Sequence, residues 1–238
     1  MNTNPLPRTS FGAAGVLEGV VADFFRRVYL WMTLGLATTG VIAFLVAGSP
    51  LLIQAIFGTP LRWVVFLAPL GVVLAMSFLQ ERLTSPLAMG LFFLYAALNG
   101  VAFASIFLVY TGTSISVVFF ITGGMFASLS AFGFLTKRDL SAMGQFFFMG
   151  VIGLIIAMVV NLFLQSPALT WAISVVGVII FAGLTAWDTQ KLKAMVSGGM
   201  VVSGTEAARK LAIFGALTLY LDFINMFLFL LRIFGNRR

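Results

Sequence analysis

The sequence predicts an all-helical polytopic membrane protein with seven transmembrane helices. Hydrophobic residues make up 61% of the 238 residues and charged residues only 9%, whereas a soluble domain carries about 25% charged residues. The mean hydropathy is +1.11. Seven apolar runs are each long enough to cross a bilayer. Their continuous apolarity favours helices, because the strands of a membrane barrel alternate in polarity and are about half as long.

The expected spans follow a short N-terminal tail, residues 1–25, which we place in the cytoplasm and which could end in an interfacial helix. Residues 26–238 then form one membrane domain. The stretch 50–62 is also fairly apolar, and either lies at the interface or lengthens the second span. The seven spans are expected at about residues 28–47, 63–80, 87–110, 114–135, 145–164, 168–187 and 211–231.

The distribution of basic residues predicts the orientation. With seven spans, ten of the fourteen Lys and Arg residues fall on the side of the N-terminus, which by the positive-inside rule is the cytoplasm. The C-terminus is then external, unless the last helix fails to cross. The net charge of +7 is explained by these loop cations, so no nucleic-acid partner is expected. The ten residues are Arg8, Arg26, Arg27, Arg82, Lys137, Arg138, Lys191, Lys193, Arg209 and Lys210.

Two residue types are missing, and their absence excludes several functions. The chain contains no Cys and no His, which excludes disulfides, thiolate chemistry, histidine metal sites and imidazole catalysis. No Lys lies inside a span, so a retinal Schiff base is excluded as well. We therefore expect neither an enzyme nor a bound cofactor.

Two of the seven acidic residues are candidates for function, because the other five lie outside the spans or at their ends. Asp222 is almost central in the span 211–231, and a carboxylate at that depth normally faces a protein interior or a water-filled path. Thr218 and Asn225 share its helical face, which predicts that this span is an inner helix. Asp188 lies at the cytoplasmic end of the sixth span.

A structural role is the alternative for each aspartate. Asp188 could be an interfacial carboxylate paired with Lys191 or Lys193. Asp222 could be a buried polar residue that holds helices together through a hydrogen bond to Asn225 or Tyr220.

Two motifs near the C-terminus are specific: TAWDTQKLK at 185–193 and LYLDFINMFLFLLRIFG at 219–235. With the stretches at 24–40, 101–115 and 132–144, they make the chain similar to the Bax inhibitor-1 family, the transmembrane Bax-inhibitor-motif proteins, and to its bacterial branch in particular. The resemblance runs from about Arg26 to Gly235. Trp187 stands where that family more usually has Tyr.

The resemblance implies six helices wrapped around the last one, and a pH-sensitive calcium leak across a bacterial cytoplasmic membrane. The family's paired aspartates correspond to Asp188 and Asp222, and Arg82 is the candidate for its arginine latch, which would pair with ionised Asp188. Carboxylates supply the oxygen ligands that Ca²⁺ prefers, so both aspartates are candidate Ca²⁺ contacts. Two facing carboxylates repel each other and can share a proton, which makes their charge depend on pH.

The depth of the two aspartates conflicts with direct contact between them. Asp188 is expected near the cytoplasmic surface, and Asp222 about 17 Å from the start of its helix. For the two to touch, either the sixth span must sit deeper than its apolar limits suggest, or the last helix must start well before Leu211 and outside the lipid.

Two other functions stay open at this point. One is a proton-coupled cation transporter that uses Asp222 as its carrier site. The other is a non-transporting membrane regulator that binds other membrane proteins, such as proteases or cell-death proteins. The expected partners are the lipid bilayer, Ca²⁺ and protons, with membrane proteins added in the last case.

Overall fold

A computed structural model describes residues 10–198 and 204–238, and the regular elements in those two ranges are all helices. The fold class expected from the sequence is confirmed. The helices are α1 (Ser10–Ala47), α2 (Pro50–Phe57), α3 (Leu61–Phe78), α4 (Ser85–Val109), α5 (Gly112–Leu135), α6 (Ser141–Leu164), α7 (Pro167–Ser197) and α8 (Glu206–Phe234).

Seven of these helices are long and apolar enough to cross a membrane. The exception is α2, which has eight residues. Its N-cap is Ser49, whose side chain accepts a hydrogen bond from the backbone N–H of Leu52, and Pro50 occupies the first turn, where a missing N–H is tolerated. The stretch 50–62 therefore contains a separate short helix and does not simply extend the second span.

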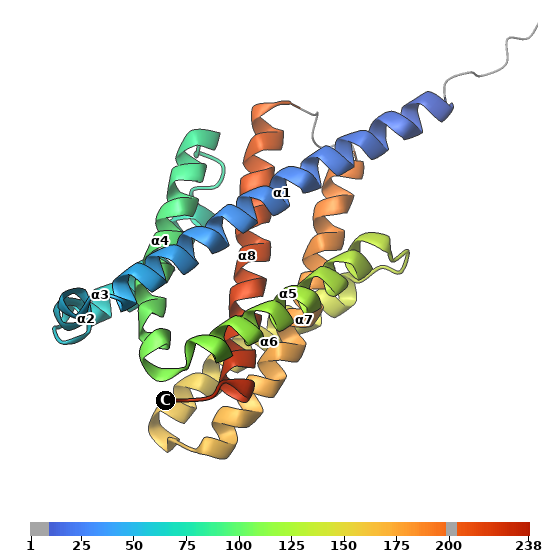
Figure 1. The fold of residues 1–238 in the computed structure, drawn as a ribbon. Coiled ribbons are helices and arrows are strands. Elements are labelled where there is room, and N and C mark those ends of the chain that lie inside the picture. The colour runs from blue at the N-terminus through green and yellow to red at the C-terminus, as the bar shows by residue number, and fades with distance from the viewer. Residues whose placement is uncertain (1–9, 199–203) are drawn as a thin grey trace, which may run out of the picture.

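The last helix is the central one. In α8, 72% of the most apolar stretch is buried, against 39% or less in each of the other six spans. Its main contacts are with α1, α4, α5 and α7, whereas α3 packs on α4 and α6 packs on α7. Figure 1 shows α8 in the middle of the bundle, with α1 crossing it. Four of the six surrounding helices thus touch the centre, and two form an outer layer.

Glycines of α5 and α6 allow these two helices to pack closely against α7. A Cβ atom at Gly133 of α5 would overlap the backbone carbonyl of Ala186, and one at Gly144 of α6 would overlap the ring of Trp187. Small residues of this kind let helix backbones approach closely in a membrane. Both contacts fall within two residues of Asp188, so they fix the part of α7 that carries this side chain.

Hydrogen bonds between distant segments define the two ends of the bundle. At one end, Lys193 Nζ donates to the carbonyl of Phe134 (2.7 Å), and the backbone N–H of Ser85 donates to Glu206 (2.5 Å). At the opposite end, the backbone N–H of Asn236 donates to Ser114 Oγ (2.9 Å). Successive helix connections therefore lie at opposite ends of the bundle, as expected for seven spans. Arg8 lies outside the described residues.

Three helix boundaries differ from the sequence-based expectation. Helix α1 begins at Ser10, so residues 10–25 continue the first span as a helix, while 1–9 lie outside the described residues. Helix α7 continues to Ser197, well beyond the predicted limit of 187. Helix α8 begins at Glu206, before the apolar run starts at Leu211. In each case the helix extends past its apolar part, which is the only part that hydropathy detects.

Candidate functional site at the aspartate pair

Asp188 on α7 and Asp222 on α8 form a buried carboxyl pair. Their carboxyl groups interact directly with each other, and the two residues are only 8% and 4% exposed. An ionised carboxylate can only accept hydrogen bonds. Two ionised carboxylates in this contact would repel each other, so a proton on one of them favours the contact across the α7–α8 interface.

The lengths of the two helices reduce the mismatch in depth to about 11 Å. Asp188 lies nine residues before Ser197, the last residue of α7, which is about 13 Å along the axis. Asp222 lies sixteen residues after Glu206, the first residue of α8, or about 24 Å. Helix α8 thus starts well before Leu211, as one alternative required. Helix α7 also carries Asp188 as an interior residue, since it continues beyond its apolar run.

One oxygen of the pair has no partner. Asp222 Oδ2 is buried and accepts no hydrogen bond from the described residues. An unpaired buried acceptor costs about 1–3 kcal/mol, and most such groups in proteins are paired. This oxygen is a place where a proton, a water molecule or a cation would be stabilised.

No basic side chain neutralises the pair within the described ranges, where the only ion pairs join Asp23 to Arg26 and Arg27. Lys191 acts on Asp188 electrostatically, but its ammonium lies over the ring of Trp187, 4.9 Å from the centroid. Lys193 donates to a backbone carbonyl instead. The alternative of an Asp188 ion pair with either lysine is not formed.

The predicted latch residue is elsewhere. Arg82 is exposed in the turn between α3 and α4, and this turn lies near the start of α8, where Lys210 Nζ donates to the carbonyl of Glu81 (3.3 Å). Among the described residues Arg82 forms no ion pair with Asp188. The structure brings the two aspartates together but not the arginine, so the latch stays a prediction.

The polar residues predicted to support Asp222 bond to their own helix. Thr218 Oγ1 donates to the carbonyl of Phe214 (3.1 Å), and Asn225 Nδ2 donates to that of Leu221 (2.8 Å). These hydrogen bonds satisfy the two polar side chains within α8, and neither of them involves the carboxyl group of Asp222. The side chain of Asp222 therefore interacts with Asp188, and the hydrogen bonds to Asn225 or Tyr220 of the structural alternative are not formed.

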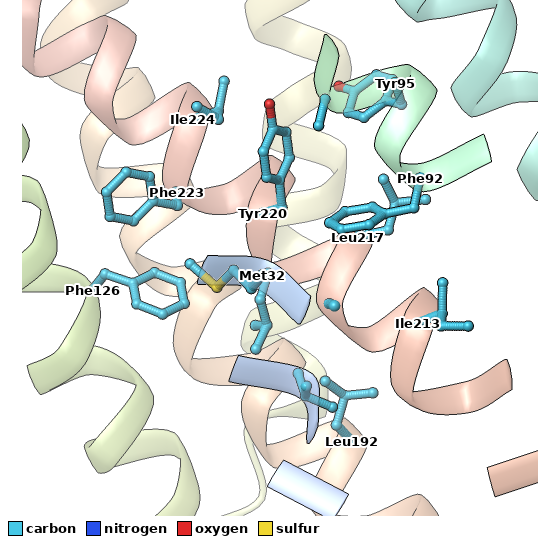
Figure 2. Packing of buried hydrophobic residues seen from close by; sticks show 14 of the residues in the cluster. Met32, Phe92, Tyr95, Phe126, Leu192, Ile213, Leu217, Tyr220, Phe223 and Ile224 are labelled. Carbon is cyan, nitrogen blue, oxygen red and sulfur yellow. The ribbon is translucent and has the colours of Figure 1, made fainter. Parts of the chain in front are cut away.

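Tyr220 belongs to a separate buried cluster. Its hydroxyl lies 2.7 Å from Thr39 Oγ1, and its ring packs edge-on against Phe92 and Tyr95, as Figure 2 shows. This contact joins α8 to α1 and α4. It anchors the central helix two residues before Asp222.

A hydroxyl cluster beside Asp188 was not predicted from the sequence. Tyr29 on α1 bonds to Ser130 Oγ on α5 (2.5 Å), and Ser130 Oγ lies 2.9 Å from Thr189 Oγ1 on α7. Thr189 directly follows Asp188, so the cluster ties three helices together at the level of the pair. The only sequence signal is a polar residue next to Asp188, because Tyr29 and Ser130 lie on distant helices.

Comparison with known proteins decides the family. The sequence profile described as "Inhibitor of apoptosis-promoting Bax1" matches residues 21–238. The chain belongs to the Bax inhibitor-1 family. The resemblance noted in the sequence is thereby confirmed, and the family match includes both helices that carry the aspartate pair.

Proteins similar to this chain occur in several bacteria. The inner membrane protein YbhL of Escherichia coli K12 is 46% identical over 217 residues, which cover 90% of this chain and 92% of that protein. RP147 of Rickettsia prowazekii is 44% identical over 215 residues, 90% of each chain. The membrane protein SpyM3_0260 of Streptococcus pyogenes is 33% identical, over 90% of this chain and 93% of its own length.

Proposed function

We propose that this protein is a calcium-permeable leak pathway whose opening depends on the protonation of Asp188 and Asp222. The observation that supports the proposal is the pair of interacting carboxyl groups, buried between two membrane-spanning helices without an ion-pair partner among the described residues. Intramembrane carboxyl groups of this kind are expensive and typically mark ion or proton pathways. Membership of the family supports the same function.

The number of protons on the pair sets the strength of the contact between α7 and α8. With one proton, the bond is charge-assisted and about twice as strong as a neutral one. A second proton makes the bond neutral and weaker, and loss of the last proton leaves two repelling carboxylates. The singly protonated pair is thus the closed state. Acidification that adds the second proton loosens the interface and raises the leak.

The same oxygens can contact a permeating ion. Ca²⁺ takes six to eight oxygen ligands, so two carboxyl groups suit brief contact rather than a resident site. Asp222 Oδ2, which is buried and unpaired, is the oxygen best placed for this contact. Ca²⁺ is accordingly a permeant ion here and not a cofactor, and we assign transport rather than catalysis to the pair.

We place the protein in the bacterial cytoplasmic membrane with the N-terminus inside. The name of the Escherichia coli relative supports the membrane, and the ten basic residues on the N-terminal side support the orientation. Asp188 then lies nine residues, or about 13 Å, from the cytoplasmic end of α7.

The test is Ca²⁺ flux into liposomes between about pH 5 and 8, for the wild type, Asp188→Asn and Asp222→Asn. Asparagine keeps the shape and one hydrogen bond but cannot titrate, so each variant should lose the pH dependence of the flux. Asp139→Asn is the matched control. Hydrogen bonds from the side chain and backbone of Ser141 hold the pKa of Asp139 below its usual range, so this exposed carboxylate stays ionised throughout.

The same assay tests the two alternative functions. A wild type that passes no Ca²⁺ at any pH would favour a regulator that binds other membrane proteins. Proton counterflow in a fixed ratio to Ca²⁺ would favour a coupled transporter. An Asp222→Asn variant with the wild-type pH profile would overturn the role of the pair.

A further inference from the structure

A groove of about 640 Å³ runs between α1 and α5 and reaches the central helix. Its volume is within the range of pockets that hold small molecules. Met32 of α1 and Phe126 of α5 form its walls, and Phe223 of α8 contributes from the centre; Figure 2 shows these three side chains facing one another. Because nine of its twelve lining residues are apolar, the groove suits a hydrocarbon chain.

Small side chains keep the groove open toward the bilayer. Ala127 and Ala131 lie one helical turn apart on α5, and both are exposed residues of the groove wall. Thr33 is the exposed residue opposite them on α1. A larger side chain at either alanine would fill the space, so the groove depends on these two positions.

Two basic side chains, Arg26 and Lys193, lie next to residues at one end of the groove, outside its lining. Phe25 and Phe134 meet there, with ring centroids 5.1 Å apart, and Lys193 Nζ lies 4.5 Å from the centroid of Phe134. Arg26 follows Phe25, and its side chain is 78% exposed. Arg26, Arg27 and Lys193 carry three positive charges. Asp23, which pairs with both arginines, carries one negative charge. An excess of two positive charges therefore remains around this end.

We infer that the α1–α5 groove is a binding site for an anionic phospholipid of the bilayer. One acyl chain lies in the groove against Met32 and Phe126, and the phosphate lies at the end marked by Arg26 and Lys193. Basic residues near a membrane surface attract anionic lipids, and the apolar walls hold the chain by van der Waals contact. This inference does not depend on the proposed calcium leak.

The experiment measures retained lipid. The full chain is reconstituted in vesicles of phosphatidylcholine and phosphatidylglycerol in equal amounts, extracted in mild detergent, and weighed with its bound lipid by native mass spectrometry. We expect one phosphatidylglycerol per chain. Ala127→Phe and Ala131→Phe should each abolish this retention, whereas Ala142→Phe, at an exposed position of α6 outside the groove, should keep it.

Charge is tested separately from shape. Arg26→Gln combined with Lys193→Gln should reduce the preference for phosphatidylglycerol over phosphatidylcholine by about fivefold for each charge removed. Arg62→Gln, at the opposite end of the bundle, should leave the preference unchanged. Each variant is compared with the wild type in thermal unfolding, and the smaller substitution Ala127→Leu replaces any variant that does not fold.

Three outcomes would overturn the inference. Equal retention of the two lipids by the wild type would show that charge plays no part. Unchanged retention in both phenylalanine variants would place the lipid elsewhere. A dimer that dissociates when the groove is filled would make a second copy of the chain the occupant.

Discussion

The hydroxyl group of Tyr29 lies 2.5 Å from Ser130 Oγ and joins α1 to α5. Ser130 in turn contacts Thr189, the residue after Asp188. A side chain of the first span is therefore linked through two hydroxyl groups to the part of α7 that carries the aspartate. The position of α1 and the geometry of the pair are coupled through this contact.

Removing the Tyr29 hydroxyl should loosen this coupling. Tyr29→Phe keeps the ring but loses the hydrogen bond, so we expect a loss of about 0.5–1.5 kcal/mol in the free energy of unfolding and a higher Ca²⁺ leak at neutral pH. Denaturation in detergent and liposome flux measure the two effects. Tyr110→Phe is the control, because that hydroxyl makes no hydrogen bond to a described residue. Equal behaviour of the two variants would argue against the coupling.

The two aspartates should act as one unit. Because the two carboxyl groups interact with each other, we expect that Asp188→Asn and Asp222→Asn each remove the pH dependence of the flux and that the double variant adds nothing further. Interacting residues are expected to be non-additive in this way. Flux curves for the four proteins at several pH values provide the measurement. Additive shifts in the midpoint would mean that the two groups titrate independently.

Gly133 should be sensitive to a single methyl group. Its Cβ would overlap the carbonyl of Ala186, so Gly133→Ala should destabilise the protein by about 1–3 kcal/mol through overpacking. Gly123→Ala on the same helix meets no atom within 4 Å and should be neutral or stabilising, since alanine is the better helix former. Thermal unfolding of both variants is the measurement. A neutral Gly133→Ala would mean that α5 and α7 can separate at no cost.

The orientation can be tested with terminal reporters. The ten-to-four distribution of basic residues predicts a cytoplasmic N-terminus and an external C-terminus. A phosphatase fusion, which is active only outside, should be active after Arg238 and inactive before Met1. A green fluorescent protein fusion should give the reverse pattern. Cytoplasmic signals from both ends would contradict the seven-span topology.

The sequence by itself determined the number of spans, the helical class and the two aspartates worth testing. Transfer of a helix into a bilayer depends on the residues within that helix, so a local apolar run such as 211–231 is sufficient to identify it. The polar residues around Asp222 also identified α8 as an inner helix. The helical repeat alone shows which residues share one face of a helix, so no other helix is needed for this inference.

Only the tertiary structure decided which side chains meet. Contact between Asp188 and Asp222 requires α7 and α8 to extend beyond their apolar runs, and hydropathy does not register those polar ends. The Tyr29–Ser130–Thr189 cluster and the groove beside it depend on how α1, α5 and α7 are rotated against one another. Close packing, such as that of Gly133 on Ala186, sets these rotations, and it involves residues that no local pattern connects.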